Sequence, residues 1–367
     1  MKVLFEKVDL GGLTVKNRFV RSATYEGFAD ESGHLTQKLF NFYEDIAAGG
    51  AGTIITGLTQ VSNREKPLQS QMAIYDDSFI LGYKKLREMV HRYEAKIIVQ
   101  LVGLGSQTTV DENNSSVMFS PSGIEDLGSN TNPQEMDIEE ILHIKQSFKN
   151  AAVRAKKASF DGIQIHAAHG YLISKFLTPY YNRRTDKYGG NLENRARLLF
   201  EIYSEIRESV GKDYPVFVKL NCDDFMDNGF SFDESKWVAK KLEELGVNAI
   251  ELSGGSASSR QNEGVARNAR HKTAYFIDYA TELQKELSIP VISVGGHRDF
   301  SEITSILNEG VINYFSLSRP ILCESSLINR WNDGDLSPSK CLSCNSCFKG
   351  GGTICILNKQ KNKQLLN

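Results

Sequence analysis

Short hydrophobic runs alternate with longer amphipathic segments along most of the chain. The runs are about five to seven residues long, are mostly rich in Val, Ile and Phe, and carry apolar residues on both faces. Such runs indicate strands that are buried on both sides, as in a parallel sheet. The eight runs are Arg18–Ala23, Thr53–Thr59, Lys96–Leu101, Gly162–His166, Val216–Asn221, Asn248–Ser253, Pro290–Val294 and Asn313–Leu317.

The segments between these runs show helical periodicity. In Asp137–Lys157, apolar residues recur mostly at three- to four-residue steps, the first residue is the expected N-cap, and Glu140 completes a capping box. Ser231–Leu245 repeats this pattern, with Glu234 at the matching position and Gly246 as the expected stop. Eight strands alternating with helices predict an α/β fold, a single (β/α)8 TIM barrel. A doubly wound open sheet is disfavoured because no convincing GxGxxG turn joins a strand to a helix.

Two regions depart from the alternation. Val102–Glu135, between the third and fourth strands, is a long loop rich in Ser, Asn, Gly and Pro. A loop of this length is usually functional or disordered, and on a barrel we expect it at the mouth of the active site, as a lid. Asp333–Asn367 holds a cysteine cluster and an end rich in Lys, Gln and Asn. We therefore predict a barrel of residues 1–332 followed by a short Cys-rich extension of residues 333–367.

Charge and hydropathy restrict the partners. Lys and Arg number 43 and Asp and Glu 45, for a net charge of −2, so the sequence offers no electrostatic case for binding nucleic acid or an anionic membrane. No stretch approaches the roughly 18 continuous apolar residues of a transmembrane helix. The amino-terminal segment reaches acidic residues at once and shows no secretory hydrophobic region, so we expect a cytoplasmic protein.

Four of the six cysteines crowd into one short segment near the carboxyl terminus. They follow the pattern C-x2-C-x2-C, with a fourth Cys seven residues further on. In a cytoplasmic chain, such crowding indicates metal or redox chemistry rather than a disulfide framework. An iron–sulfur cluster, a structural zinc ion and free or regulatory thiols all remain open. The residues are Cys341, Cys344, Cys347 and Cys355.

The end of the fourth expected strand gathers candidate catalytic groups. His166, His169 and Tyr171 follow one another closely there, and strand ends carry the active site in such barrels. The two histidines have zinc-like spacing, but no acidic third ligand is adjacent, so a zinc site is weakly supported. Imidazole N–H groups can instead polarise a substrate carbonyl oxygen while a nearby phenol supplies a proton.

The segment HAAHGYLISKFLTPYYNRRTDKYGGNLENRARLLFEI closely resembles the signature of the old yellow enzyme family. This is the FMN-dependent NADH:flavin oxidoreductase group that includes 2,4-dienoyl-CoA reductase and trimethylamine dehydrogenase. Shorter matches to KNRFVRSAT, IIVQL, VGG and SRPIL follow in the right order and extend the resemblance over roughly residues 3 to 330.

The resemblance implies a role for each matching residue. His166 and His169 correspond to the pair that binds the substrate oxygen, and Tyr171 to the proton donor. Gln100 corresponds to the amide that pairs with the pyrimidine edge of the flavin. Backbone at the first two strands is expected against the flavin ring, and turns after strands seven and eight are expected at the phosphate. These further residues are Ala23, Thr24, Gly57, Gly295, Gly296, Ser318 and Arg319.

The chain departs from the family pattern at three places. Lys219 stands where many members have Arg facing flavin N1 and O2, so it supplies the charge without the bidentate fork. Tyr25 stands where subgroups place Thr or Cys near flavin N5 and O4, and both redox tuning and simple packing stay open. Longer relatives carry a [4Fe-4S] cluster just after the barrel, with slightly longer gaps between its cysteines than are present here.

The resemblance implies that NAD(P)H reduces FMN and leaves. The C=C bond of an α,β-unsaturated carbonyl compound is then reduced by hydride from flavin N5 and a proton from Tyr171. Oxidative amine dehydrogenation or demethylation, and a flavin-binding electron carrier without turnover, are the alternatives. We expect the chain to lack the domains that follow the barrel in the long relatives. We therefore expect electrons to come from a redox partner or from NAD(P)H at the FMN, and we expect a homo-oligomer that acts on a small molecule.

Overall fold

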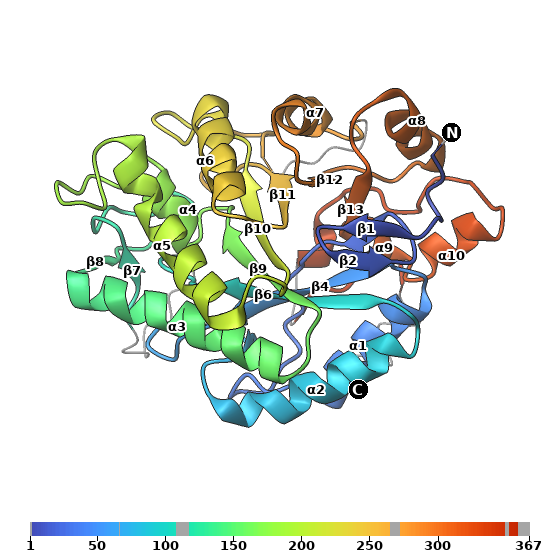
Figure 1. The fold of residues 1–367 in the computed structure, drawn as a ribbon, viewed down its shortest axis with the longest axis horizontal. Coiled ribbons are helices and arrows are strands. Elements are labelled where there is room, and N and C mark those ends of the chain that lie inside the picture. Colours follow the sequence, from blue (N-terminus) through green and yellow to red (C-terminus); the bar gives the residue numbers. More distant parts are fainter. Residues whose placement is uncertain (1, 66, 108–116, 265–271, 349–351, 359–367) are drawn as a thin grey trace.

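A computed structural model describes residues 2–65, 67–107, 117–264, 272–348 and 352–358. Within these residues, eight parallel strands form a closed ring (Figure 1), because the last strand pairs with the first as well as with its predecessor. Each strand overlaps one of the eight predicted runs, so the TIM-barrel prediction is confirmed. The strands are β3 (Phe19–Arg21), β4 (Thr53–Gln60), β6 (Lys96–Val102), β9 (Gly162–Ala167), β10 (Val216–Asn221), β11 (Ala249–Ser253), β12 (Val291–Val294) and β13 (Tyr314–Leu317).

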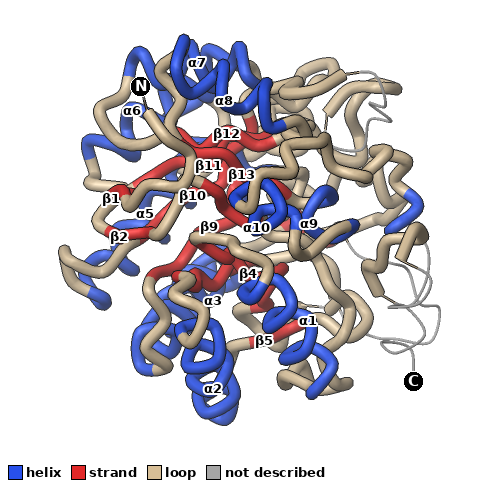
Figure 2. The backbone as a smooth tube through the Cα atoms, turned by 90° about the vertical axis from the view of Figure 1, so that its right-hand side faces the viewer, coloured by secondary structure: helices blue, strands red, loops and turns tan. Residues whose placement is uncertain are grey.

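Helices surround the strands on the outside of the barrel (Figure 2). Both predicted N-caps are present, and Ser231 and Glu234 form the predicted reciprocal capping box. At α3 the side chain of Asp137 accepts from the backbone N–H of Glu140, but the Glu140 carboxylate pairs with Arg64 and does not complete the predicted box. Among the described helices, none is long and apolar enough to cross a membrane. They are α1 (Gln37–Ala48), α2 (Ile80–His91), α3 (Ile138–Lys157), α4 (Leu172–Leu177), α5 (Leu192–Val210), α6 (Phe232–Glu244), α7 (Ile277–Glu286), α8 (Phe300–Glu309), α9 (Arg319–Cys323) and α10 (Leu327–Asn332).

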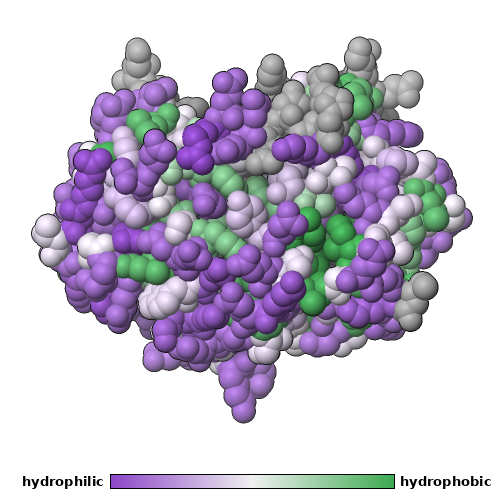
Figure 3. All heavy atoms as spheres, turned by 90° about the horizontal axis from the view of Figure 1, so that it is seen from above, coloured by the Kyte–Doolittle hydropathy of each residue, from purple (hydrophilic) through white to green (hydrophobic). Residues whose placement is uncertain are grey.

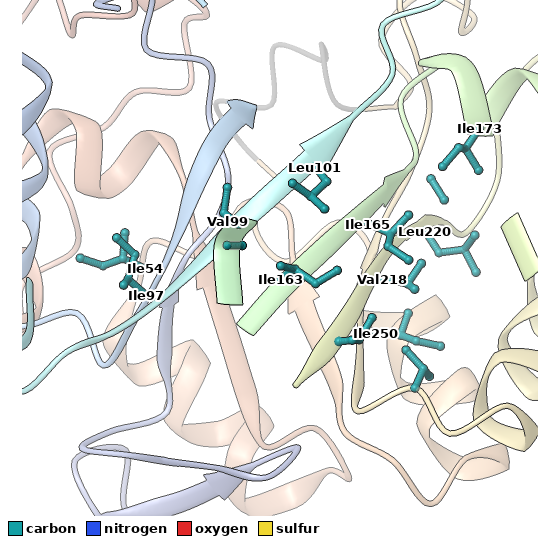
Figure 4. Packing of buried hydrophobic residues seen from close by; sticks show 14 of the residues in the cluster. Ile54, Ile97, Val99, Leu101, Ile163, Ile165, Ile173, Val218, Leu220 and Ile250 are labelled. Carbon is teal, nitrogen blue, oxygen red and sulfur yellow. The ribbon is translucent and has the colours of Figure 1, made fainter. Parts of the chain in front are cut away.

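The strands separate two apolar layers. Along β6, Ile97, Val99 and Leu101 point outward and pack between the barrel and its helices (Figure 4), while Ile98 and Gln100 alternate with them and point inward. The inner layer includes Ile98 and Phe217, and the hairpin of β1 (Val8–Leu10) and β2 (Leu13–Val15) packs against it at the amino-terminal end of the barrel. Hydrophilic residues dominate the surface seen from above, apart from a few hydrophobic patches (Figure 3).

The long loop after β6 carries the short parallel pair of β7 (Phe119–Ser120) and β8 (Gln134–Glu135). The buried side chain of Lys175 on α4 pairs with Asp126 of this loop. Part of the loop, residues 108–116, lies outside the described residues, and its role as a lid stays a prediction. Two short 3-10 turns, Asp77–Phe79 and Ser346–Phe348, and the short strand β5 (Met72–Ala73) complete the elements.

The segment after α10 folds back onto the barrel. The backbone N–H of Ser339 donates to the carbonyl of Arg298 at 2.8 Å, and that of Thr353 donates to the carbonyl of Glu26 at 2.8 Å. Residues 349–351, with two glycines of the Gly350–Gly352 run, and residues 359–367 lie outside the described residues. The boundary between a barrel of residues 1–332 and an extension of residues 333–367 stays a prediction.

Candidate active site

A cavity of about 360 Å³ opens at the carboxyl ends of the barrel strands. It brings together all but one of the barrel residues expected at the site: Ala23, Thr24, Gln100, His166, His169, Tyr171, Lys219, Gly295, Gly296, Ser318 and Arg319. The exception is Gly57, which does not line the cavity. Its backbone N–H instead donates to the carboxylate of Glu26 and to the hydroxyl of Tyr43, each at 2.9 Å.

Three aromatic rings meet where β9 ends. The ring centroid of His166 lies 4.8 Å from that of Tyr171 and 5.2 Å from that of His169. A tight turn causes this convergence, because His169 and Gly170 both adopt positive φ (62° and 78°) before Tyr171 caps α4. The backbone N–H of His169 donates to Asn221 at 3.2 Å and thereby fixes the turn.

Burial keeps the three groups uncharged. It lowers the pKa of His166 well below 6.5, and together with the nearby Lys219 ammonium it lowers the pKa of His169 to about 3. Burial also raises the pKa of Tyr171 well above 10. At neutral pH the site therefore presents two neutral imidazoles, each with one N–H, and one protonated phenol.

A buried carboxylate organises the polar layer at the floor of the cavity. Glu251 accepts hydrogen bonds from Ser22 and Ser316 at 2.7 Å each and from Gln164 at 2.9 Å. The ammonium of Lys219 lies 3.2 Å from the same carboxylate. Burial by itself would raise the pKa of Glu251, but the Lys219 charge and these donors outweigh it and hold the pKa below its usual value. Glu251 is therefore ionised, and it holds Lys219 at the cavity wall.

Gln100 extends this network to the cavity. Its Nε2 donates to Oε1 of Gln164 at 2.7 Å. Its Oε1 is buried and has no hydrogen-bond partner in the described part of the chain. An unpaired buried carbonyl is costly, so this atom marks a place where a ligand donor is expected.

The turn after β12 lines the cavity with two glycines, Gly295 and Gly296. Gly295 and Gly296 adopt φ of 118° and 84°. A Cβ atom on either glycine would lie 2.8 Å from the ring of Tyr275. Arg319, on the turn after β13, donates to the Tyr275 hydroxyl at 3.0 Å, and the hydroxyl of Ser318 lies 2.7 Å from that of Thr24. Backbone N–H groups and a guanidinium of this kind suit a phosphate.

The lining residues that sequence reasoning missed include Tyr275, Phe276, His297 and Arg298. His297 and Arg298 directly follow the glycine pair, and this adjacency could have identified them. Tyr275 and Phe276 belong to a segment before α7 that carries no recognisable pattern, and only the fold brings them to the site. Tyr25 lines the cavity as well, and its hydroxyl donates to the backbone carbonyl of Gln69.

A second, much smaller cavity of about 20 Å³ is lined by Cys341, Cys344, Cys347 and Cys355. The fold thus brings the four predicted cysteines to one place. Within the described ranges, no three His, Cys, Asp or Glu side chains are arranged to hold a metal ion. Arg319 lines both cavities and forms part of the wall between them.

Comparison with known proteins places the chain in a family. The sequence profile of the "NADH:flavin oxidoreductase / NADH oxidase family" matches residues 3–335. The chain is similar to an NADH oxidase of Thermoanaerobacter brockii, with 38% identity over 352 residues that cover 95% of this chain and 54% of the relative. It is also similar to a cinnamate reductase of Clostridium sporogenes, with 31% identity over 365 residues that cover 94% of this chain and 55% of the relative.

The chain thus spans about half the length of these two curated relatives. Among solved structures, the old yellow enzyme homologue from Zymomonas mobilis aligns with a TM-score of 0.77 and 25% identity, covering 92% of this chain and 94% of that one. The resemblance noted in the sequence is confirmed, and the chain belongs to the NADH:flavin oxidoreductase / NADH oxidase family.

Proposed function

We propose that this protein is an FMN-dependent oxidoreductase that uses NAD(P)H to reduce the C=C bond of α,β-unsaturated carbonyl compounds. One observation carries the proposal. Two neutral imidazoles and a protonated phenol converge in the cavity that also contains the glycine turn and two arginines. The names of the relatives, an NADH oxidase, a cinnamate reductase and an old yellow enzyme homologue, agree with this chemistry.

The residues present fit FMN. The unpaired Oε1 of Gln100 and the ammonium of Lys219 would face the pyrimidine edge, where a donor and developing negative charge are found. Gly295 and Gly296, whose backbone lines the cavity, would hold the phosphate together with Ser318, Arg319 and Arg298. Ala23 and Thr24 would lie against the ring. Gly57 would act indirectly, by anchoring β4.

FMN, when bound, supplies hydride transfer, and the protein supplies binding, orientation and electrostatics. His166 and His169 would donate their N–H groups to the carbonyl oxygen of the substrate, and this polarises the conjugated C=C bond. Tyr171 would then deliver its proton to the α-carbon. Because the histidines are neutral, they hold the oxygen without protonating it outright.

We also propose an iron–sulfur cluster at Cys341, Cys344, Cys347 and Cys355, with a structural zinc ion as the alternative. The four thiols line one cavity, and four cysteines from one short segment are a common ligand set for such clusters. A four-iron cluster spaces its thiolates further apart than a zinc ion, whose sulfur ligands lie about 2.3 Å from the metal. A cluster at this place would exchange electrons with a redox partner protein. The expected homo-oligomer stays a prediction.

The first test is the visible spectrum, with iron and zinc analysis, of protein purified without oxygen. Flavin bands with about four irons per chain would support both parts of the proposal. Zinc, or no metal, would refute the cluster and leave the reductase. Protein that cannot be loaded with FMN would refute the function itself.

Turnover then separates the alternatives. NADH and NADPH are assayed against a panel of enones, and flavin reduction by amines is followed by stopped flow. Enone reduction is the expected result. Fast flavin reduction by amines with no enone turnover would indicate an oxidative dehydrogenase, and no turnover with either class would indicate an electron carrier.

A further inference from the structure

The buried carboxylate Glu251 lies behind the cavity rather than in its wall. It is fully buried in the middle of β11, and its neighbours Gln164 and Gln100 are almost completely buried as well. Of these three residues, only Gln100 lines the cavity. A purely apolar packing role for Glu251 is excluded, because isolated charges are not placed in barrel interiors without a compensating network.

The hydrogen bonds of this network run in a single direction. An ionised carboxylate can only accept, so Gln164 must turn its Nε2 toward Glu251, as the 2.9 Å contact shows. Its Oε1 then points the other way and accepts from Nε2 of Gln100 at 2.7 Å. Flipping Gln164 would set an amide oxygen against the carboxylate, and flipping Gln100 alone would set two amide oxygens against each other.

This row of hydrogen bonds ends at the cavity in a hydrogen-bond acceptor. With one Nε2 hydrogen engaged by Gln164, the Oε1 of Gln100 is left buried and unpaired. The oxidised flavin pyrimidine edge has one donor, the N3–H, and its other polar atoms accept. The orientation of Gln100 therefore matches that N–H, and it is fixed by a carboxylate two residues away in the network.

We propose that Glu251 is a positioning residue that acts through Gln164 to hold the Gln100 amide with its carbonyl oxygen toward the flavin. This inference rests on the proposed function, since FMN is the ligand. Ser22 and Ser316 support the arrangement by donating to the other carboxylate oxygen, so that Glu251 cannot rotate.

The test measures FMN dissociation constants of the apoprotein by flavin fluorescence, which does not depend on turnover. Glu251→Gln supplies both a donor and an acceptor at this place, so the amides lose their fixed direction. We expect FMN to bind about 10-fold more weakly, as for the loss of one hydrogen bond to a buried acceptor. Glu65→Gln is the matched control. Glu65 is a buried carboxylate that binds the backbone N–H groups of Leu104 and Gly105 outside the cavity lining, and its variant should bind FMN like the wild type.

A double-mutant cycle identifies the route of the effect. In a Gln100→Ala/Lys219→Met background, which also removes the ammonium that Glu251 holds at the cavity wall, the further change Glu251→Gln should alter FMN affinity by less than threefold, because its effect passes through Gln100. The swap Gln164→Glu/Glu251→Gln moves the carboxylate one step along the network, where it still accepts from Gln100. It should restore affinity to within threefold of the wild type.

Each result of these experiments supports or overturns the positioning role of Glu251. Wild-type affinity of Glu251→Gln, a tenfold loss that persists in the Gln100→Ala/Lys219→Met background, or a swap that binds FMN more than threefold more weakly would each overturn the proposal. If Glu251→Gln fails to fold, as judged by circular dichroism, the swap variant alone decides by the same threshold. Failure of the wild-type protein to bind FMN would instead refute the proposed function, and the assignment of the Gln100 ligand with it.

Discussion

Replacing Tyr171 by Phe removes one oxygen atom from the cavity and leaves the ring in place. The Tyr171 hydroxyl has no hydrogen-bond partner in the described part of the chain, so its loss strands no buried polar group. We therefore expect the unfolding temperature to change by no more than about 2 °C, as for a substitution of less than roughly 0.5 kcal/mol. Any large change in activity would then reflect chemistry rather than folding.

The size of the chemical effect follows from the state of the phenol. Because burial holds the pKa of Tyr171 well above 10, the proton is available at every pH at which the enzyme is usually assayed. A positioned general acid contributes about 10²- to 10⁴-fold to a rate. Water that enters the open cavity can supply part of the proton, so we expect a loss of about 10²- to 10³-fold, or about 2.7 to 4 kcal/mol in the activation free energy.

Stopped-flow spectroscopy of the two half-reactions provides the assay. Flavin reduction by NAD(P)H needs no proton from Tyr171 and should stay within twofold of the wild type. Flavin reoxidation by an enone should slow by the full factor, without dependence on pH between 6 and 9. Tyr203→Phe, which removes a phenol hydroxyl beside Arg207 on the outer helix α5, should leave both steps unchanged. Equal loss in the two half-reactions would refute the assignment of Tyr171 as the proton donor.

Three further predictions concern Gly296 in the turn after β12, Arg319 and the buried His297. Gly296→Ala should abolish FMN retention, because its Cβ would lie 2.9 Å from the backbone nitrogen of Ala274. Gly190 has the same φ of 84° as Gly296 but open space around it, so Gly190→Ala should cost only about 1 kcal/mol of backbone strain and keep FMN. Equal loss of FMN in the two variants would contradict the steric argument. Arg319→Met should weaken FMN about 10-fold and riboflavin less than twofold, measured by fluorescence titration, and equal losses would place the guanidinium away from the phosphate. Burial lowers the pKa of His297 from 6.5 to about 4, so below pH 6.5 only the unfolded chain binds this proton and the free energy of unfolding decreases as the pH falls. The drop in unfolding temperature from pH 7 to pH 5 should therefore be smaller in His297→Gln, and an identical drop would contradict burial of a neutral imidazole.

The barrel could be predicted because its signal is local. Each strand is a short run with apolar residues on both faces, and each clear helix carries its cap in the sequence, as Asp137 and Ser231 show. Eight such strands alternating with helices, with no dinucleotide-binding turn to indicate an open sheet, were enough to predict the closed barrel. The order of the family motifs along the chain was enough to predict that Gln100, His166 and Arg319 line the same cavity.

The polar network behind the cavity could not be predicted in the same way. Glu251 lies in an ordinary apolar run, and nothing in its neighbours along the chain shows that Ser22, Gln164, Lys219 and Ser316 surround it. These contacts join four different strands and Ser22, the residue after β3, so they depend on the register of the closed barrel. Gly57 shows the converse case: its backbone position fits the motif, but its N–H already donates to Glu26, and its place against the flavin stays a prediction.

Closure of the barrel joins positions 19 and 315, which lie near opposite ends of the sequence. During synthesis, the first strand emerges from the ribosome long before the strand that completes its pairing. The floor of the cavity takes Ser22 from beside the first barrel strand and Ser316 from the last, so the nascent protein has no finished flavin site until the last barrel strand has been made. Contacts so distant along the chain also slow the search for the native state. Cofactor capture therefore has to wait for the whole barrel, and a shortage of flavin would act on chains whose barrel is already complete.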